Sequence, residues 1–320
     1  IYYESGSDFT YGEGGPGDSH TPEEAAAHTV IHIRKPGTYS LSGKLSRGQI
    51  AVDLGEDAEE DPTAVVTLIL NGADITCTVA PAILFLNTYE CDGNWSADSA
   101  QAEVDTSAAG ANLILEGQNI VNGSHVAKIF KDKDGEKKLW KQDGAIYSYM
   151  SMSVSGPGSL ELTDDNEGLD TELHLTVNGG DIAIRSDNDG INTNEDGISV
   201  TTVNGGSLLI HAGLGKEGDG IDSNGSFEMT GGTLVVMGPT RSGNGSLDVN
   251  GSAVITDGTV VMAGASGMAT NFTSASQGTM LINTGSQSEG SEISVKDSSG
   301  NEIIKVTADC SYQTVLISRP

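Results

Sequence analysis

The sequence predicts an all-β protein that folds as a parallel β-helix, a solenoid with coils of about 26 residues. Four segments, each a turn followed by β-forming residues, begin at Gly179, Gly205, Gly231 and Asp257, so that each begins 26 residues after the one before. Glycine accounts for 43 of the 320 residues, and aromatic residues are only 5%. That composition suits a narrow core crossed by many turns.

Alternate residues of each repeated strand are expected to point into the core. These are Ile182 and Ile184, Leu208 and Ile210, Leu234 and Val236, and Val260 and Met262. The residues between them are also apolar, which predicts that the outer face of this strand is partly covered or forms a surface for something else. They are Ala183, Leu209, Val235 and Val261. A second strand is expected before each turn, and a third short piece covers 167–171, 189–193, 219–223 and, less regularly, 244–249.

The repeat length favours a solenoid over other repeat folds. A propeller blade or kelch repeat needs about 40–50 residues, and a leucine-rich repeat needs its own leucine and asparagine pattern with a helical side. Neither is present. Two or three strands in about 26 residues therefore predict one coil of a parallel β-helix.

The domain boundaries follow from where the repeat pattern fades. Residues 29–320 are expected to form a single β-helix domain whose N-terminal part is less regular, with a polar excursion near 128–144. Residues 1–28 are expected to be a linker that ends in a candidate capping helix, because Thr21 is a good N-cap and Pro22 suits the first helical position.

The net charge of −29 argues against nucleic acid and against an anionic membrane as partners. No run of 18 apolar residues is present, so no membrane-spanning segment is expected. The spacing of Cys77, Cys91 and Cys310 fits no zinc pattern. Cys77 and Cys91 are either a disulfide or ordinary buried thiols.

Acidic residues recur at the third piece of each coil. An acid or amide precedes glycine at Asp143, Glu167, Asp189, Asp219 and Asn244, and Asp170, Asn192 or Asp222 follows three residues later. Equivalent residues of stacked coils lie about 4.8 Å apart, and like charges at that spacing are unfavourable unless they are protonated or bridged. Asp-Gly and Asn-Gly are also simply good turn formers.

Calcium is the natural bridge for stacked carboxylates, because it takes six to eight oxygen ligands in adaptable geometry. The spacing of the acids matches neither an EF-hand loop nor a nine-residue calcium repeat. The candidate calcium ligands are Asp164, Asp165, Glu167, Asp170, Asp187, Asp189, Asn192, Asp196, Asp219 and Asp222.

Three basic residues, Arg185, Lys216 and Arg241, precede these turns and are candidate sugar-binding residues. They offset the carboxylates, bind an acidic sugar or act as a base; the alternative is that they are surface cations without a role. The aromatic residues Trp95, Trp140, Tyr147 and Tyr149 suit stacking on sugar rings, although packing in the core or a cap explains each of them more simply.

Several segments taken together resemble a bacterial cell-surface β-helix family that binds carbohydrate. They are YSLSGKLSRGQIAVD, VTLILNGADIT, DGAIYS, the repeated DGI[ND][TS] turns with GGxLxI strands, and CSYQTVLISRP, and the resemblance covers roughly residues 30–320. It implies a calcium-containing, right-handed β-helix, akin in fold to pectate lyases, with Glu167, Asp170, Asp189, Asn192, Asp219 and Asp222 in the matching turns. The segment NGSLDV departs from this pattern at Asn244.

The function implied is non-catalytic binding of plant cell-wall polysaccharide, namely cellulose and acidic sugars such as polygalacturonate. The implied location is extracellular or at the bacterial cell surface, with a lipid anchor as one means of attachment. A calcium-dependent pectate lyase is the alternative enzyme, but the sequence shows no catalytic cluster separable from the turns. A structural adhesin or spacer, stiffened by calcium, is the third alternative.

Overall fold

The computed structural model describes residues 8–9, 24, 26–94, 96–98, 100–101, 103–131, 137–215 and 217–320; for 8–9, 127–131 and 137–141 only the backbone is described. Strands β1 to β30 dominate this part of the chain, and η1, a 3₁₀ turn over Glu56–Glu60, is its one helical element with defined bounds. The all-β prediction is therefore confirmed. Among the described residues, no helix is long and apolar enough to cross a membrane.

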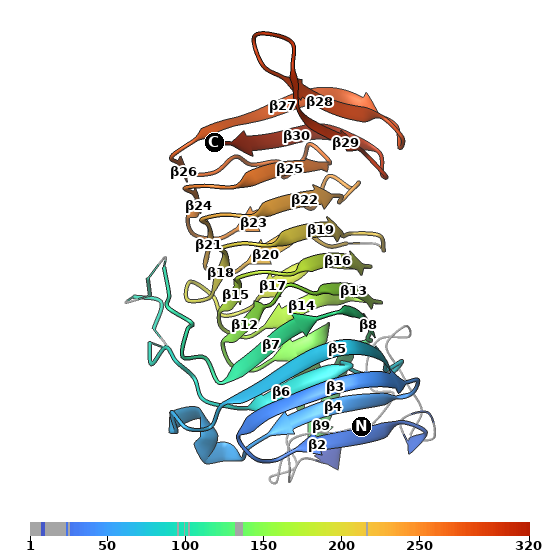
Figure 1. The fold of residues 1–320 in the computed structure, drawn as a ribbon, viewed down its shortest axis with the longest axis vertical. Helices are drawn as coiled ribbons and strands as arrows, with labels where there is room; N and C mark the ends of the chain where they lie inside the picture. The colour runs from blue at the N-terminus through green and yellow to red at the C-terminus, as the bar shows by residue number, and fades with distance from the viewer. Residues whose placement is uncertain are drawn as a thin grey trace.

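The C-terminal half repeats a unit of three strands, and successive units stack along the long axis of the molecule (Figure 1). We call each unit a coil. The first is β14 (Glu167–Thr171), β15 (Leu175–Val177) and β16 (Asp181–Ser186). The next three are β17 (Ile191–Thr193), β18 (Val200–Val203) and β19 (Ser207–His211); β20 (Ile221–Ser223), β21 (Ser226–Met229) and β22 (Thr233–Met237); and β23 (Asp248–Val249), β24 (Ala253–Ile255) and β25 (Thr259–Gly264).

Parallel pairing between coils confirms the 26-residue spacing. Ile182 pairs with Leu208, Leu208 with Leu234, and Leu234 with Val260. On the sheet that contains β14, β17 and β20, however, Leu169 pairs with Ile191 and Ile191 with Ile221, which are 22 and 30 residues apart. The connection after β16 is short and the connection after β19 is longer, so the turns absorb the difference while the paired strands stay in register.

The core is a column of aliphatic side chains inside the coils. All eight residues predicted to point inward on β16, β19, β22 and β25 are at most 2% exposed and belong to one core cluster. Leu169, Ile191, Ile221 and Leu247 add the inward residues of β14, β17, β20 and the segment before β23. The residues that follow them in the strands, including the acids described below, therefore point away from the core.

The C-terminal segment covers part of the outer apolar face. Strand β30 (Tyr312–Arg319) runs antiparallel to both β25 and β27 (Gly278–Gln287), after the short β26 (Ser274–Ala275). The hairpin of β28 (Glu292–Lys296) and β29 (Glu302–Thr307) contributes to a second cluster that includes Val235 and Val261. Leu209 remains 43% exposed. The predicted partial covering is thus confirmed at the C-terminal end.

The N-terminal half stacks in the same parallel manner with longer and less regular spacing. For example, Gly37 pairs with Val66, and Leu68 pairs with Leu113. Its strands are β2 (Thr29–Ile33), β3 (Gly37–Leu45), β4 (Gly48–Asp53), β5 (Val66–Thr76), β6 (Ile83–Asn87), β7 (Ala111–Glu116), β8 (Gln118–Asn122), β11 (Gly144–Ser148), β12 (Met152–Ser155) and β13 (Ser159–Asp164).

Two segments leave the stack. Strands β9 (Val126–Lys131) and β10 (Lys137–Gln142) form an antiparallel pair where the polar excursion was expected, and β1 (Asp8–Phe9) pairs with β9. Apart from 8–9, 24 and 26–28, the predicted linker and capping helix lie outside the described residues. The described residues of the second segment, 88–110, form no strand, and the segment projects from the side of the stack in teal (Figure 1). The sequence did not predict it.

The three cysteines are free thiols. Cys77 is buried in the core, whereas Cys91 lies at the start of segment 88–110 and Cys310 lies near the C-terminus. Cys77 and Cys91 are therefore separate thiols and do not form a disulfide.

Close packing of the turns gives a first prediction. A Cβ atom at Gly190 would lie 2.2 Å from Cγ2 of Ile210 and 2.5 Å from the carbonyl oxygen of Gly220. We expect Gly190→Ala to lower the free energy of unfolding by about 1–3 kcal/mol in denaturant titrations, the usual cost of overpacking. Gly243→Ala is the control, because nothing lies within 4 Å of its added Cβ, and it should change stability by less than about 0.5 kcal/mol. Equal stabilities would contradict the tight turn.

Candidate functional site

Acidic side chains form a row on the outer side of β14, β17, β20 and β23. Asp170 pairs with Asn192, Asn192 with Asp222, and Asp222 with Asp248. The predicted alignment of Asp170, Asn192 and Asp222 is confirmed, and Asp248, which the sequence did not single out, extends it. We call these four residues the second row. Asp170 is fully buried and Asn192 is 6% exposed, whereas Asp222 and Asp248 are half-buried.

A first row precedes it in the chain and comprises Glu167, Asp189 and Asp219. The carbonyl of Asp189 accepts the N–H of Gly168, and the carbonyl of Asp219 accepts the N–H of Gly190. These contacts repeat from coil to coil, so the three acids occupy equivalent positions.

The ends of the first row correct two sequence assignments. Gly144, and not Asp143, stands opposite Glu167, because the core residue Ile146 pairs with Leu169 and sets the register. At the other end, the N–H of Gly220 bonds to the carbonyl of Gly245, which puts Gly245 rather than Asn244 in the row. Acid-glycine and amide-glycine dipeptides look alike in sequence, but the register depends on core residues two or three positions away.

First-row carboxylates connect neighbouring coils. The side chain of Asp189 accepts the backbone N–H of Asp219, and the side chain of Asp219 accepts the backbone N–H of Gly245. Each acid thereby satisfies a backbone donor of the next coil through one of its two oxygens. These acids have a structural role whether or not they bind a ligand.

Asparagine side chains surround the most buried acids. Asn192 Nδ2 donates to Glu167 Oε2 at 3.1 Å, and Asn188 Nδ2 donates to Glu167 Oε1 at 3.3 Å. Asn194 Nδ2 donates to Asp170 Oδ1 at 2.7 Å. Within the described part of the chain, Oδ2 of Asp170 and Oδ1 of Asn192 are buried without a hydrogen-bond partner. Two unsatisfied oxygens thus stand at adjacent positions of the second row.

The rows carry strongly perturbed carboxyl groups. Burial, and then the neighbouring carboxylates, raise the pKa of Glu167 and of Asp170 well above the ordinary range. Burial raises the pKa of Asp189 and of Asp222 to about 7 and that of Asp219 to about 6. Each of these groups is therefore expected either to keep its proton or to be ionised beside a cation that neutralises its charge.

A second acidic group lies where β13 ends. One ligand atom from each of His125, Asp164 and Asp165 lies within 4.8 Å of the others, and this is the one such trio of His, Cys, Asp or Glu among the described residues. His125 Nδ1 is 2.9 Å from Asp165 Oδ1, while Oδ2 of Asp164 is buried without a partner. Burial and then Asp165 raise the pKa of Asp164 well above its ordinary range. Asp164 and Asp165 are among the ligands that the sequence predicts, whereas His125 is not.

The remaining predicted ligands and cations lie elsewhere. Asp187 and Asp196 are exposed, and neither side chain has a hydrogen bond to the rows in the described structure. Nη1 of Arg185 lies 2.7 Å from Nδ1 of His211. The other ring nitrogen of His211 contacts Asp309 near the C-terminus. Arg241 is exposed, and Lys216 lies outside the described residues. Of the aromatic residues considered for stacking on sugar rings, Tyr147 is only 1% exposed and packs edge-on against Tyr149.

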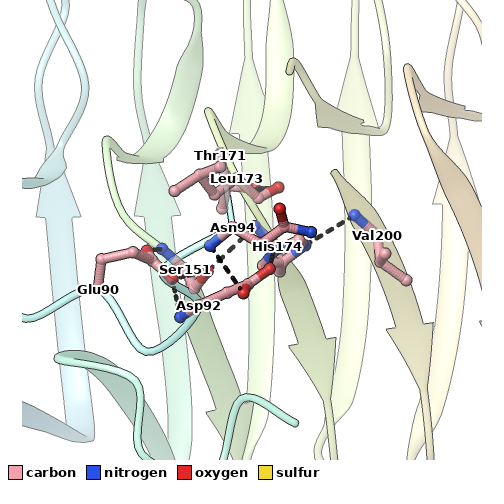
Figure 2. Close-up of polar contacts among 8 residues, drawn as sticks. All are labelled: Glu90, Asp92, Asn94, Ser151, Thr171, Leu173, His174 and Val200. Carbon is pink, nitrogen blue, oxygen red and sulfur yellow. Dashed lines mark hydrogen bonds and ion pairs between the residues drawn. The ribbon is translucent and has the colours of Figure 1, made fainter. Parts of the chain in front are cut away.

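Figure 2 shows a buried polar network that attaches segment 88–110 to the coils. His174 Nε2 lies 3.1 Å from Asp92, and the N–H of Val200 donates to His174 Nδ1 at 3.0 Å. The backbone N–H and hydroxyl of Ser151 both donate to Glu90. Because Nδ1 of His174 accepts a main-chain N–H, the ring is not available as a base toward Ser151. The network positions the segment and is not a catalytic triad, and the scattered histidines of the sequence did not reveal it.

A sequence model of carbohydrate-binding domain-containing proteins matches residues 27–315. A carbohydrate-binding domain-containing protein of Acetivibrio thermocellus is 27% identical over 157 residues, which are 49% of this chain and 45% of that protein. The chain therefore matches less than half the length of this relative. A polysaccharide lyase-like protein from C. thermocellum, solved as a gadolinium derivative, shares 21% identity with a TM-score of 0.43, over 75% of this chain and 89% of that one.

The raised pKa values predict the pH dependence of the metal-free protein. Asp189 and Asp222 have pKa values of about 7 when folded, against about 3.9 in an unfolded chain. The folded state binds their protons more tightly, so their contribution stabilises the fold below pH 4 and is lost as the pH rises through 7. In the presence of chelator, we expect a melting temperature at least about 2 °C higher at pH 5 than at pH 8.

The double variant with Asp189→Asn and Asp222→Asn serves as the control for that experiment. It lacks the two titrating groups, so the difference between pH 5 and pH 8 should shrink clearly. If the wild type and the double variant had the same pH dependence, the two raised pKa values would be wrong.

Proposed function

Because this chain belongs to the family of carbohydrate-binding domain-containing proteins, we propose that it is a non-catalytic binding protein for cell-wall polysaccharide that holds calcium in its acid rows. The polysaccharides proposed are cellulose and acidic chains such as polygalacturonate. The observation that carries the calcium part is the pair of buried, unsatisfied oxygens on Asp170 and Asn192.

A calcium ion fits the donors present around Asp170. Carboxylate and amide oxygens are the ligands that calcium prefers, and Glu167, Asp170 and Asn192 offer them side by side from neighbouring coils. A bound cation would also offset the cost of burying the charges of Glu167 and Asp170 and the repulsion from neighbouring carboxylates. These residues, rather than the exposed Asp187 and Asp196, are therefore the proposed ligands, with Asp189, Asp219 and Asp222 extending the site along the rows.

The trio of His125, Asp164 and Asp165 is a second candidate metal site. Its unsatisfied Asp164 Oδ2 resembles that of Asp170, but an imidazole nitrogen is part of the donor set. Nitrogen ligands favour transition metals over calcium.

We infer further that the parallel stack winds as a right-handed β-helix located outside the cell or on its surface. The regular parallel register of consecutive coils supports the winding, since crossovers between parallel strands are almost always right-handed. Calcium sites suit a location outside the cell, where extracellular modules commonly bind this ion.

Acidic sugar needs calcium in this proposal, because a chain of net charge −29 repels a polyanion. A bound ion is often the largest charge in its site and reverses the local potential. Open coordination positions can then accept a uronate carboxylate. Arg185, Lys216 and Arg241 remain proposed sugar contacts, although Arg185 is already engaged with His211.

The calcium proposal predicts opposite effects of one substitution with and without metal. Asp170→Asn replaces a buried carboxyl, whose ionisation is costly, by a neutral amide, so it should raise the melting temperature of the chelated protein. It should also remove most of the increase that calcium causes in the wild type. The exposed Asp187→Asn is the matched control and should alter neither value. If chelation leaves the wild-type melting curve unchanged and elemental analysis finds no calcium, the proposal fails.

Acidic-sugar binding should depend on the first row. Asp189→Asn and Asp219→Asn keep an oxygen to accept the N–H of the next coil, yet remove the charge that attracts calcium. We expect each to weaken binding to polygalacturonate about tenfold in pull-down titrations and to leave cellulose binding unaltered, and added salt should weaken only the acidic-sugar term. Ultraviolet-absorbing unsaturated products in the same incubations would instead indicate a lyase.

A further inference from the structure

An open groove lies between the projecting segment 88–110 and the side of the stack. Its volume is about 560 Å³, within the range of about 300–1,000 Å³ that is usual for ligand sites. It is lined by Glu103, Val104, Asp105, Thr106, Ser107, Thr176, Asn178, Thr202, Asn204 and Glu228. The groove belongs to the sheet of β15, β18 and β21, whereas the acid rows belong to the sheet of β14, β17 and β20.

The floor of the groove is a row of hydrogen-bonding side chains. The lining residues Thr176, Thr202 and Glu228 pair in parallel from coil to coil. Their strand neighbours are buried, so these three side chains point outward. From Thr176 to Glu228 the floor spans two strand spacings, about 9.6 Å. It therefore follows the stacking direction and suits an extended chain.

A second polar row borders the floor at the following turns. Asn204 Nδ2 donates to Asn178 Oδ1 at 2.9 Å, and Thr230 Oγ1 donates to Asn204 Oδ1 at 2.6 Å. Each amide still has an N–H and a lone pair for another partner, because the side chain can make about four hydrogen bonds. Asn178 and Asn204 are exposed. The border thus presents both donors and acceptors.

The opposite wall, residues 103–107, is held in place by buried contacts. Thr106 Oγ1 donates to Thr176 Oγ1 at 2.6 Å, which joins the wall directly to the floor. The network of Figure 2 attaches the same segment further back, through Asp92 and His174. The wall is therefore preorganised, which reduces the entropy cost of binding a ligand.

The charge of the lining selects against an acidic ligand. Glu103, Asp105 and Glu228 are carboxylates, and none of the described lining residues is cationic or aromatic. Burial, and then the charge of Glu103, raise the pKa of Glu228, so the two carboxylates influence each other across the groove. A polyanion would be repelled here, whereas hydroxyl groups would donate to the carboxylates and exchange hydrogen bonds with the amides.

We propose that this groove is a binding site for an uncharged, hydroxyl-rich polysaccharide chain, distinct from the calcium-dependent site proposed for acidic sugar. The inference rests on the proposed carbohydrate-binding function and assigns the neutral ligand to its own face. One protein would then hold neutral and acidic chains at once, on two different sheets.

Calorimetric titration with a soluble cello-oligosaccharide tests the site. Glu228→Ala should weaken binding about tenfold, the effect of losing one or two hydrogen bonds to a carboxylate. Thr202→Arg places a long side chain on the floor and should abolish binding. Glu161→Ala is the matched control, since it removes an exposed carboxylate on β13 outside the groove, and it should keep wild-type affinity. Melting temperatures verify that the variants are folded.

A competition experiment on the wild type gives an independent readout. Saturating oligogalacturonate with calcium should leave the affinity for the cello-oligosaccharide unchanged, and chelator should not reduce it. The inference is overturned if the two sugars compete, if chelator abolishes neutral binding, or if the folded groove variants bind as the wild type does. Absence of neutral binding in the wild type also overturns it. Binding of oligogalacturonate in the same series tests the proposed function separately.

Discussion

The register between successive coils is the constraint on which the rest of this protein depends. Inward-facing aliphatic residues such as Ile182, Leu208 and Leu234 pair in parallel and bury themselves against one another. A slip by one residue would turn each of these strands over and expose its apolar side chains. The core thus specifies which outward residues become neighbours, including those with no apolar character of their own.

Outward residues inherit that register, even where their own interactions are unfavourable. Asp170, Asn192 and Asp222 are brought into line by the core beneath them, although burial makes adjacent carboxylates costly. Asparagine side chains and backbone N–H groups donate hydrogen bonds to some of these buried oxygens. One oxygen of Asp170 and one of Asn192 have no such donor, and a cation would bind there. On the other sheet, the same register lines up Thr176, Thr202 and Glu228, with a different chemical result.

Segments that leave the stack turn these rows into sites. Parallel coils alone offer flat faces, and a concave site needs a wall. Segment 88–110 supplies one by folding back onto the coils through the contacts of Asp92 with His174 and of Thr106 with Thr176. The C-terminal strands act differently, because they cover Val261 and leave Leu209 exposed. Loops on a rigid scaffold commonly carry function in this way.

The sequence by itself determined the all-β class, the 26-residue spacing, the inward residues and the alignment of Asp170 with Asn192 and Asp222, because each is a local periodic signal repeated along the chain. The placements of Asp143 and Asn244 were wrong by one residue, since the register depends on distant core pairs. Only the tertiary structure decided that His125 approaches Asp164 and Asp165, that Arg185 contacts His211, and that segment 88–110 walls a groove. These contacts join residues at irregular separations, so no period in the sequence predicts them; they follow from how turns of unequal length bring the coils together.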